Sequence, residues 1–245
     1  MKSLAISKKY VYNLILVTFM VKNTVKIALD GPSGSGKSTL ARNLARHYGY
    51  VYIDTGSLYR TIGLFVLRRG IASDDAESII RLLPEISISM RLEDGGGAVY
   101  LGDERMGSEI RTPECSIYAS DVSKIPEVRE FLLETQRSIA RENNVIMDGR
   151  DIGTVILPDA QVKIFITASD DARALRRYRE LLERGQAVTL DEVKADMLWR
   201  DANDKNRNVA PAIPAEDAIL FDNSELTVEG TLAAAIKIID EKLAE

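Results

Sequence analysis

The chain has 245 residues, of which 45% are hydrophobic and 28% are charged, a composition typical of a globular protein that buries a substantial core. Its formal net charge of -5 argues against a nucleic-acid-binding scaffold, because binding to a phosphate backbone requires a dense basic surface. The single cysteine, Cys115, excludes an intramolecular disulfide and fits a reducing compartment, so we expect a cytoplasmic protein. From the chain length we expect one domain with an elaboration, and we expect a monomer.

Residues 1–23 have the charge pattern of a targeting segment. Lys2, Lys8 and Lys9 precede an apolar run over residues 10–21, as in the charged and apolar regions of a signal peptide. The run is too short to span a bilayer comfortably, and no small-x-small cleavage site follows it before the next predicted strand. We therefore expect an N-terminal extension, or an upstream start codon with Met20 as the real initiator, and no membrane association.

Two strand-helix units come next in the chain. Residues 25–29 form an apolar, β-branched run, and a Gly/Ser-rich turn over residues 31–36 leads into a predicted helix that Gly49 closes. A second strand over residues 50–54 runs into another helix, which has apolar residues at helical spacing as far as Val66. Two consecutive units of this kind predict a parallel sheet that is covered by helices on both faces.

The pattern changes from about residue 84. Apolar and polar residues alternate over residues 86–90 and again over residues 99–101, with a turn predicted at residues 94–97, so we expect an antiparallel hairpin. Helices are predicted to follow Pro113 and Pro126. We interpret the segment of about residues 84–142 as an insertion in the α/β order.

The strand-helix order resumes after the insertion. Strands are predicted over residues 145–147, 162–167 and 218–221, with helices between them. The fold class is therefore α/β, with a five-stranded parallel sheet in a domain that covers residues 24–245.

A phosphate-binding loop lies between the first strand and the first helix. The residues match the pattern G-x-x-x-x-G-K-S/T and are Gly31, Pro32, Ser33, Gly34, Ser35, Gly36, Lys37 and Ser38, followed by Thr39. The glycines allow successive backbone N–H groups to surround a phosphate, and the helix N-terminus adds positive potential. Lys37 is expected to reach the β- and γ-phosphates of ATP, and the Ser38 hydroxyl is a candidate ligand for Mg²⁺.

The loop predicts nucleoside triphosphate binding, which switches, motors and kinases share. A regulatory GTPase would need an N-K-x-D string after a strand, and the nearest string, at residues 203–206, has the wrong order and is predicted to be helical. The identity of a second substrate must come from other residues.

Arginines gather where a second phosphate could bind. Arg60 and Arg150 follow the second and third core strands, at the edge where open α/β sheets bind ligands. Arg200, Asp204 and Arg207 have the spacing of one helix face, which alone would more often be a solvated ion-pair stripe. A further basic face is formed by Arg173, Arg176 and Arg177. An acidic protein that concentrates arginine at one cleft is expected to neutralise phosphates there.

The sequence resembles the bacterial cytidylate kinases over nearly the whole chain from about Val25. The matching segments are residues 29–38, 54–60, 107–112, 148–154 and 206–207. The resemblance implies the fold of a nucleoside-monophosphate kinase, with a mobile lid at about residues 169–185 and an enlarged monophosphate-binding insertion. Three departures stand out, because Ser38, Thr55 and Asn203 occupy positions where other members have glycine, serine and arginine.

The resemblance also implies roles for individual residues. Arg60, Arg150 and Arg207 would hold the acceptor phosphate of CMP or dCMP, Asp204 with Arg200 would hold the sugar hydroxyls, and Ser120, Arg129 and Asp151 would read the base. Thr55 would complete the CMP site. Asp148 would orient Mg²⁺ through water, and Arg173 and Arg177 would close over the transferring group. Other acceptors (UMP, AMP or dephospho-coenzyme A) and a regulatory nucleotide switch remain alternatives.

Overall fold

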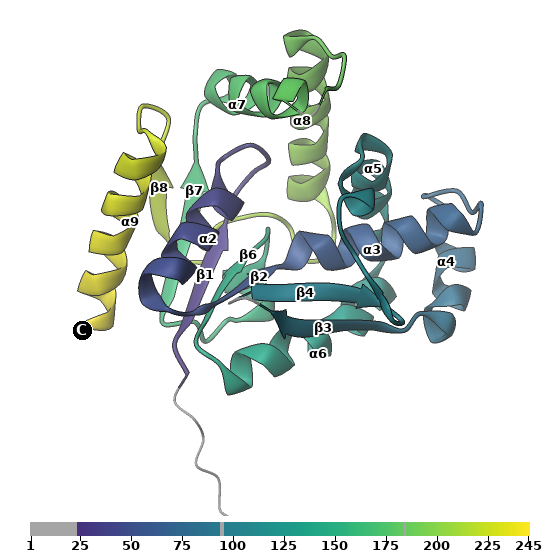
Figure 1. The fold of residues 1–245 in the computed structure, drawn as a ribbon, viewed down its shortest axis with the longest axis horizontal. Helices are drawn as coiled ribbons and strands as arrows, with labels where there is room; N and C mark the ends of the chain where they lie inside the picture. The colour runs from purple at the N-terminus through teal and green to yellow at the C-terminus, as the bar shows by residue number, and fades with distance from the viewer. Residues whose placement is uncertain (1–23, 94–95, 184) are drawn as a thin grey trace, which may run out of the picture.

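The structure is a computed structural model that describes residues 24–93, 96–183 and 185–245 (Figure 1). The predicted N-terminal extension lies outside the described residues. Within those ranges, none of the helices is both long enough and apolar enough to cross a bilayer.

The five predicted core strands are confirmed. They are β1 (Lys26–Asp30), β2 (Val51–Asp54), β6 (Val145–Asp148), β7 (Val162–Thr167) and β8 (Ile219–Asp222). All neighbours in the order β2-β6-β1-β7-β8 are parallel, so the carboxyl ends of the strands meet at one edge of the sheet. The register places Asp148 beside both Leu29 and Asp54, which brings the aspartates that end β2 and β6 to this edge.

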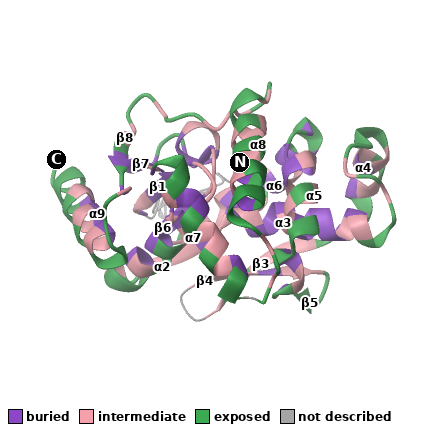
Figure 2. Ribbon diagram, turned by 90° about the horizontal axis from the view of Figure 1, so that it is seen from above, coloured by how far each residue is buried: buried purple, intermediate pink, exposed green. Residues whose placement is uncertain are grey.

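Helices cover both faces of the sheet, as predicted. Helices α2 (Lys37–Tyr48) and α9 (Val228–Leu243) bury their apolar residues against Ile27 and Leu29 of β1. On the opposite face, Ala28 packs with residues of α6 (Pro126–Glu142) and of a π-helical turn, Ile152–Ile156. Because successive strand residues point to opposite faces, this alternation buries β1 on both sides. Figure 2 shows buried residues on the central strands and exposed residues on the outer side of α9.

The predicted hairpin is antiparallel, and it continues the same sheet. Strands β3 (Ile88–Glu93) and β4 (Gly96–Leu101) pair with each other, β5 (Glu104–Arg105) pairs with β4, and β4 lies parallel to β2 through Tyr52 and Gly96. Of the turn predicted at residues 94–97, Gly96 and Gly97 belong to β4, and residues 94–95 lie outside the described part of the chain.

A second core joins the hairpin to four helices. Helix α3 (Thr55–Arg68) packs on α5 (Pro113–Val122), with α4 (Ala76–Leu82), α6 and two short 3-10 turns, Leu83–Glu85 and Glu109–Arg111, completing the cluster. Cys115 is buried in this core, as predicted. At Gly63, a Cβ atom would lie 2.9 Å from the Cβ of Tyr118, so the absence of a side chain lets α3 and α5 approach closely.

Helices α7 (Asp170–Glu183) and α8 (Leu190–Asn206) pack against each other above the carboxyl edge of the sheet (Figure 1). Thr189 and Glu192 form a capping box that fixes the start of α8. The helix ends at Asn206, so the prediction that Arg207 shares a helix face with Arg200 and Asp204 is wrong. Arg207 is extended, and the chain turns back so that the Ala212 N–H donates to the Asp204 carbonyl oxygen at 2.9 Å.

Candidate functional site

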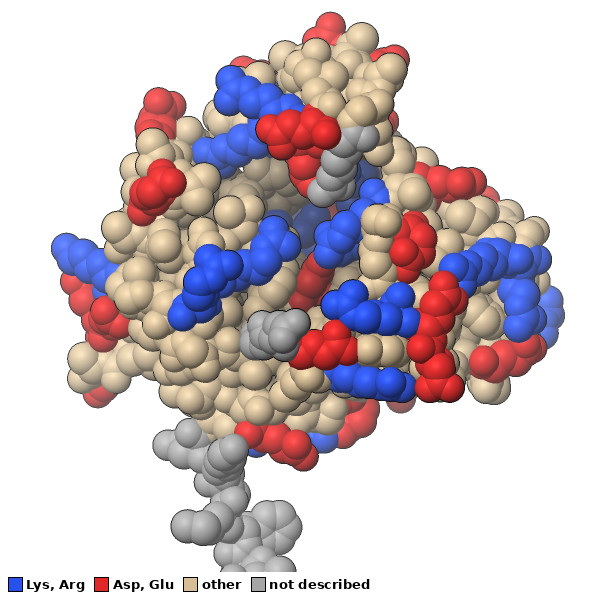
Figure 3. All heavy atoms as spheres, in the orientation of Figure 1, with Lys and Arg blue, Asp and Glu red and all other residues tan. Residues whose placement is uncertain are grey.

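One cavity of about 660 Å³ opens at the carboxyl edge of the sheet, and Figure 3 shows Lys and Arg side chains around a hollow on this face. Every residue predicted for the acceptor site lines this cavity: Thr55, Arg60, Ser120, Arg129, Arg150, Asp151, Arg200, Asp204 and Arg207. From the phosphate loop and its helix, Ser33, Gly34, Gly36, Lys37, Ser38 and Thr39 also line it, whereas Gly31, Pro32 and Ser35 do not. The two predicted sites therefore share one space.

The phosphate loop takes backbone conformations that require glycine. Gly31, Gly34 and Gly36 have φ values of 144°, 72° and 86°, and a Cβ at Gly31 would lie 2.0 Å from the Ile166 carbonyl oxygen. The Lys37 Nζ group donates to the Pro32 carbonyl oxygen at 2.6 Å and to the Ser35 hydroxyl at 3.3 Å, so the ammonium is held inside the loop. Burial, and then the Arg150 guanidinium, lower the pKa of Lys37.

A carboxylate stands beside the start of α2. Asp148 accepts hydrogen bonds from the Ser38 hydroxyl at 2.6 Å and from the Tyr52 hydroxyl at 3.1 Å. The Thr55 hydroxyl donates to the Asp148 carbonyl oxygen at 2.8 Å. The Ser38 and Asp148 oxygens are the ligand type that Mg²⁺ prefers, together with the phosphates of a nucleotide, so this chain's residues fit the ion. The sequence analysis did not include Tyr52 in the site, because its position in an apolar run predicts only a strand residue.

Two buried aspartates at the strand ends are expected to lose their protons at a higher pH than an ordinary aspartate does. Burial raises the pKa of Asp148 to about 6, aided by the neighbouring Asp54 carboxylate. Burial also raises the pKa of Asp30 to about 6, although the Ile152 and Gly153 N–H groups donate to its carboxylate, each at 2.8 Å. These groups contribute stability below the usual aspartate pKa of about 3.9, and the contribution is lost as pH rises through about 6.

NMR titration of the nucleotide-free protein tests this expectation. We expect two side-chain carboxyl signals to titrate near pH 6, of which Asp148→Asn removes one and Asp30→Asn removes the other. Titration of both signals near pH 4 would contradict the assignment.

Arg60 and Arg111 share one carboxylate partner, and the sequence analysis gave Arg111 no role. Asp54 forms ion pairs with Arg60 at 2.9 Å and with Arg111 at 3.2 Å. Although burial opposes ionisation, these two guanidinium groups hold the pKa of Asp54 below its usual value. Among the described residues, the buried Nε of Arg60 has no hydrogen-bond partner. Arg111 also lines the cavity, so it joins the candidate site.

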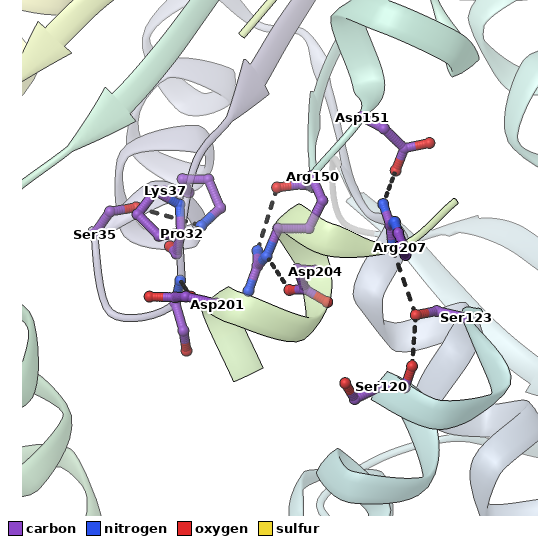
Figure 4. Close-up of polar contacts among 12 residues, drawn as sticks. Pro32, Ser35, Lys37, Ser120, Ser123, Arg150, Asp151, Asp201, Asp204 and Arg207 are labelled. Atoms are coloured by element: carbon purple, nitrogen blue, oxygen red, sulfur yellow. Dashed lines mark hydrogen bonds and ion pairs between the residues drawn. The ribbon is translucent and has the colours of Figure 1, made fainter. Parts of the chain in front are cut away.

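Arg150 and Asp204 form the centre of the site. Arg150 Nε donates to Asp204 at 2.9 Å, and Figure 4 shows this pair between the loop that carries Lys37 and the contact of Asp151 with Arg207. Burial, and then the nearby Arg150, lower the pKa of Arg200 to about 10. The Arg200 Nε is buried and has no partner within the part of the chain that the structure describes.

The far end of the cavity holds one buried carboxylate between two arginines. Asp151 pairs with Arg129 and, at 3.2 Å, with Arg207. All three side chains are less than one-tenth exposed. Ser123 accepts a 3.3 Å hydrogen bond from Arg129 at its carbonyl oxygen, and the buried hydroxyl of Ser120 has no partner among residues described by the structure. The guanidinium of Arg207 therefore faces Asp151 in this structure.

The arginines of α7 point in different directions. Arg177 lines the cavity and pairs with Glu180 at 2.8 Å. Arg173 was expected to face the transferring group, but it does not line this cavity, and its buried side chain binds Asp201 and, at 2.9 Å, the Ser33 carbonyl oxygen. A carboxylate shielded from solvent is a stronger partner for a guanidinium than water is, and Asp201 is 17% exposed, which explains the difference.

Comparison with known proteins identifies the family. The sequence model of the cytidylate kinases matches residues 27–241. The chain belongs to the cytidylate kinase family. Family members include cytidylate kinases of Thermosipho melanesiensis, with 46% identity over 89% of this chain and 97% of the relative, and of Caldanaerobacter subterraneus subsp. tengcongensis, with 50% identity over 86% and 92%. The cytidylate kinase of Streptococcus gordonii is 45% identical over 89% of this chain and 99% of its own.

Proposed function

We propose that this protein transfers the terminal phosphoryl group of ATP to CMP or dCMP, giving ADP and the corresponding diphosphate. The observation that carries the proposal is a single cavity that joins a phosphate loop to an arginine-rich pocket with buried, unpartnered donors. Among the described residues these donors include Arg60 Nε, Arg200 Nε and the Ser120 hydroxyl. Buried polar groups rarely lack partners in the absence of a functional reason, and a bound nucleotide would supply them.

ATP is proposed to bind at residues 31–39. The loop's backbone N–H groups would surround the β-phosphate, and Lys37 would exchange its contact with Pro32 for the β- and γ-phosphates. Ser38 would hold Mg²⁺ and Asp148 would orient the ion through water, and the bound ion would supply charge neutralisation for the phosphates. Tyr52 would orient Asp148 through the hydroxyl contact described above.

The acceptor phosphate is proposed to bind Arg60 and Arg150, with Arg207 nearby. Arg60 is paired with Asp54 and Arg150 with Asp204, so a dianionic phosphate would compete with these carboxylates. Asp204 would then be released to accept from the sugar hydroxyls, assisted by Arg200. Thr55 would lie beside this site, since it lines the cavity.

Base recognition is proposed to depend on Asp151, Arg129 and Ser120. Cytosine carries an exocyclic amine donor next to acceptors at N3 and O2, so a carboxylate can accept from the amine while a guanidinium donates to the acceptors. The buried pair of Asp151 and Arg129 supports this assignment. Uracil has an oxygen in place of the amine, which would oppose Asp151 with a second acceptor.

Transfer would need charge neutralisation more than a general base. The attacking phosphate oxygen is already anionic, so positive groups around the transferring group lower the barrier most directly. Arg150 and Arg177 line the cavity and are proposed for this role, whereas Arg173 could take it only by leaving Asp201. We also propose that residues 169–185 act as the lid, that residues of about 84–142 form the monophosphate-binding insertion, and that the enzyme acts in the cytoplasm as a monomer.

A coupled assay of ADP release with a panel of acceptors tests the function. We expect CMP or dCMP to give the highest kcat/KM among CMP, dCMP, UMP, AMP and dephospho-coenzyme A. A higher kcat/KM with another acceptor would reassign the substrate. Binding of ATP without ADP release for any acceptor would indicate a nucleotide switch.

A further inference from the structure

The phosphate loop is held at Ser33 by the helix pair α7–α8. The Ser33 N–H donates to the Asp201 carboxylate at 2.9 Å, and the Ser33 carbonyl oxygen accepts from Arg173 Nη1 at 2.9 Å. Arg173 and Asp201 also form an ion pair with each other. Both polar groups of Ser33's backbone are thus bound by one pair of side chains, and Figure 4 shows Asp201 beside the loop that carries Lys37.

Close packing accompanies these hydrogen bonds. A Cβ atom on Gly34 would lie 2.9 Å from the Arg173 carbonyl oxygen, so the loop and the start of α7 touch backbone to backbone. The side chains of Arg173 and Asp201 are 5% and 17% exposed, and hydrogen bonds to charged groups are stronger at such depth than in water. A shift of α7 would therefore displace the loop.

A second contact joins α7 to the loop one helical turn later. Arg176 donates to the Asn223 side-chain oxygen at 3.0 Å, and the Asn223 amide donates to the Ser35 carbonyl oxygen at 3.0 Å. Arg173 and Arg176 are three residues apart, so they lie on neighbouring positions of one helix face. Arg173 and Arg176 thus bind the loop or its support, and Arg176 and Arg177 line the cavity.

Helix α8 connects this contact to the acceptor side of the cavity. Asp201 directly follows Arg200 and precedes Asp204, and both of these neighbours line the cavity. Asp204 in turn binds Arg150 at 2.9 Å. One helix therefore carries the carboxylate that binds the phosphate loop and two residues assigned to the acceptor.

We propose that Asp201, together with Arg173, is a positioning residue that fixes the phosphate loop relative to α8 and so sets the donor nucleotide against the acceptor. The inference rests on the proposed assignment of residues 31–39 as the ATP site. Phosphoryl transfer requires the attacking oxygen and the γ-phosphorus to lie in line, so a small displacement of the loop is costly in rate.

Asp201→Asn tests the proposal, because it keeps the shape of the side chain and removes the charge that binds Arg173. We expect KM for Mg-ATP to rise about 10-fold or more and kcat to fall, since a charge-assisted pair is weakened at the loop. Calorimetric titration with CMP alone should give an unchanged Kd, because the acceptor residues keep their own contacts. The matched control is Asp196→Asn, the same change at an exposed position of α8, which should behave as wild type.

Arg173→Met is the second variant, and it covers the case in which Asp201→Asn does not fold. It should raise KM for Mg-ATP by a similar factor, and the double variant should be little worse than either single variant, because both remove one interaction. If the pair has a purely structural role, the variants would have a lower melting temperature and a KM for Mg-ATP within about twofold of wild type, and that result would overturn the proposal. Loss of kcat in Arg173→Met with normal Mg-ADP affinity would also overturn it, in favour of a direct role at the transferring group.

The same assay separates this inference from the proposed function. If Lys37→Ala keeps wild-type kinetics, the loop is not the donor site and both proposals fail. If Lys37→Ala is inactive while Asp201→Asn behaves as wild type, only the positioning role is wrong.

Discussion

Replacing Lys37 with alanine is expected to lower kcat by about 1,000-fold, the upper range for removal of one preorganised hydrogen-bond donor from an active site. Lys37 is the lysine of the phosphate loop, and its ammonium lies within the loop, 2.6 Å from the Pro32 carbonyl oxygen. No other group in the loop carries a positive charge to the β- and γ-phosphates. The measurement is single-turnover and steady-state ADP release with saturating Mg-ATP and CMP.

The fold should survive this change. Lys37 is only 6% exposed, and burial already disfavours its charge, so truncation removes a desolvated ammonium. Lys37 lines the cavity, so water can fill the space that its side chain leaves. We expect thermal unfolding close to that of wild type. Lys237→Ala on α9, where the lysine side chain is 78% exposed, is the matched control and should leave kcat unchanged. A Lys37→Ala variant with wild-type turnover would refute the assignment of the donor site.

Replacing Asp151 with asparagine is expected to reduce the preference for CMP over UMP, measured as the ratio of the two kcat/KM values, by about 10- to 100-fold. The carboxylate can only accept from the cytosine amine, whereas an amide can also donate to the O4 oxygen of uracil. The variant should therefore lose efficiency with CMP and lose less, or gain, with UMP. The measurement is the ADP-release assay with both acceptors at several concentrations.

The ratio is the decisive quantity, because Asp151→Asn also has a structural cost. Asp151 pairs with Arg129 and Arg207 in a buried cluster, and weakening one member leaves charge without a partner. A loss of folded protein lowers both rates equally and leaves the ratio unchanged. Equal losses with CMP and UMP would mean that Asp151 supports the cluster without reading the base.

Ion pairs across the cavity preorganise the proposed acceptor site. Each proposed phosphate-binding arginine has a carboxylate partner: Arg60 pairs with Asp54, Arg150 with Asp204 and Arg207 with Asp151. These pairs hold the guanidinium groups near their working positions, so less side-chain entropy is lost when a phosphate replaces the carboxylate. Arg111, which shares Asp54, belongs to the same arrangement.

Local sequence determined the positions of the core strands along the chain, the phosphate loop and the residues at the strand ends. Buried strands read as apolar runs, and the loop between Gly31 and Ser38 is a short contiguous pattern whose glycines are required by its own backbone angles. Arg60 and Arg150 could be placed because a residue that follows a parallel strand must lie at the carboxyl edge. The assignment of Ser120, Arg129 and Asp151 to base recognition came from the resemblance to the cytidylate kinases, and it stays a prediction.

Only the tertiary structure decided which partner each charged side chain takes. Asp201 binds Ser33 across 168 positions of sequence, and Asp54 binds Arg111 across 57. Arg173 turns away from the cavity, and Arg207 leaves the helix face that its spacing predicted. The physical reason is that periodicity fixes which face of a helix or strand is buried, whereas the direction of a long charged side chain follows from the nearest buried group of opposite charge. That group is supplied by elements distant in sequence, through packing that no local pattern encodes.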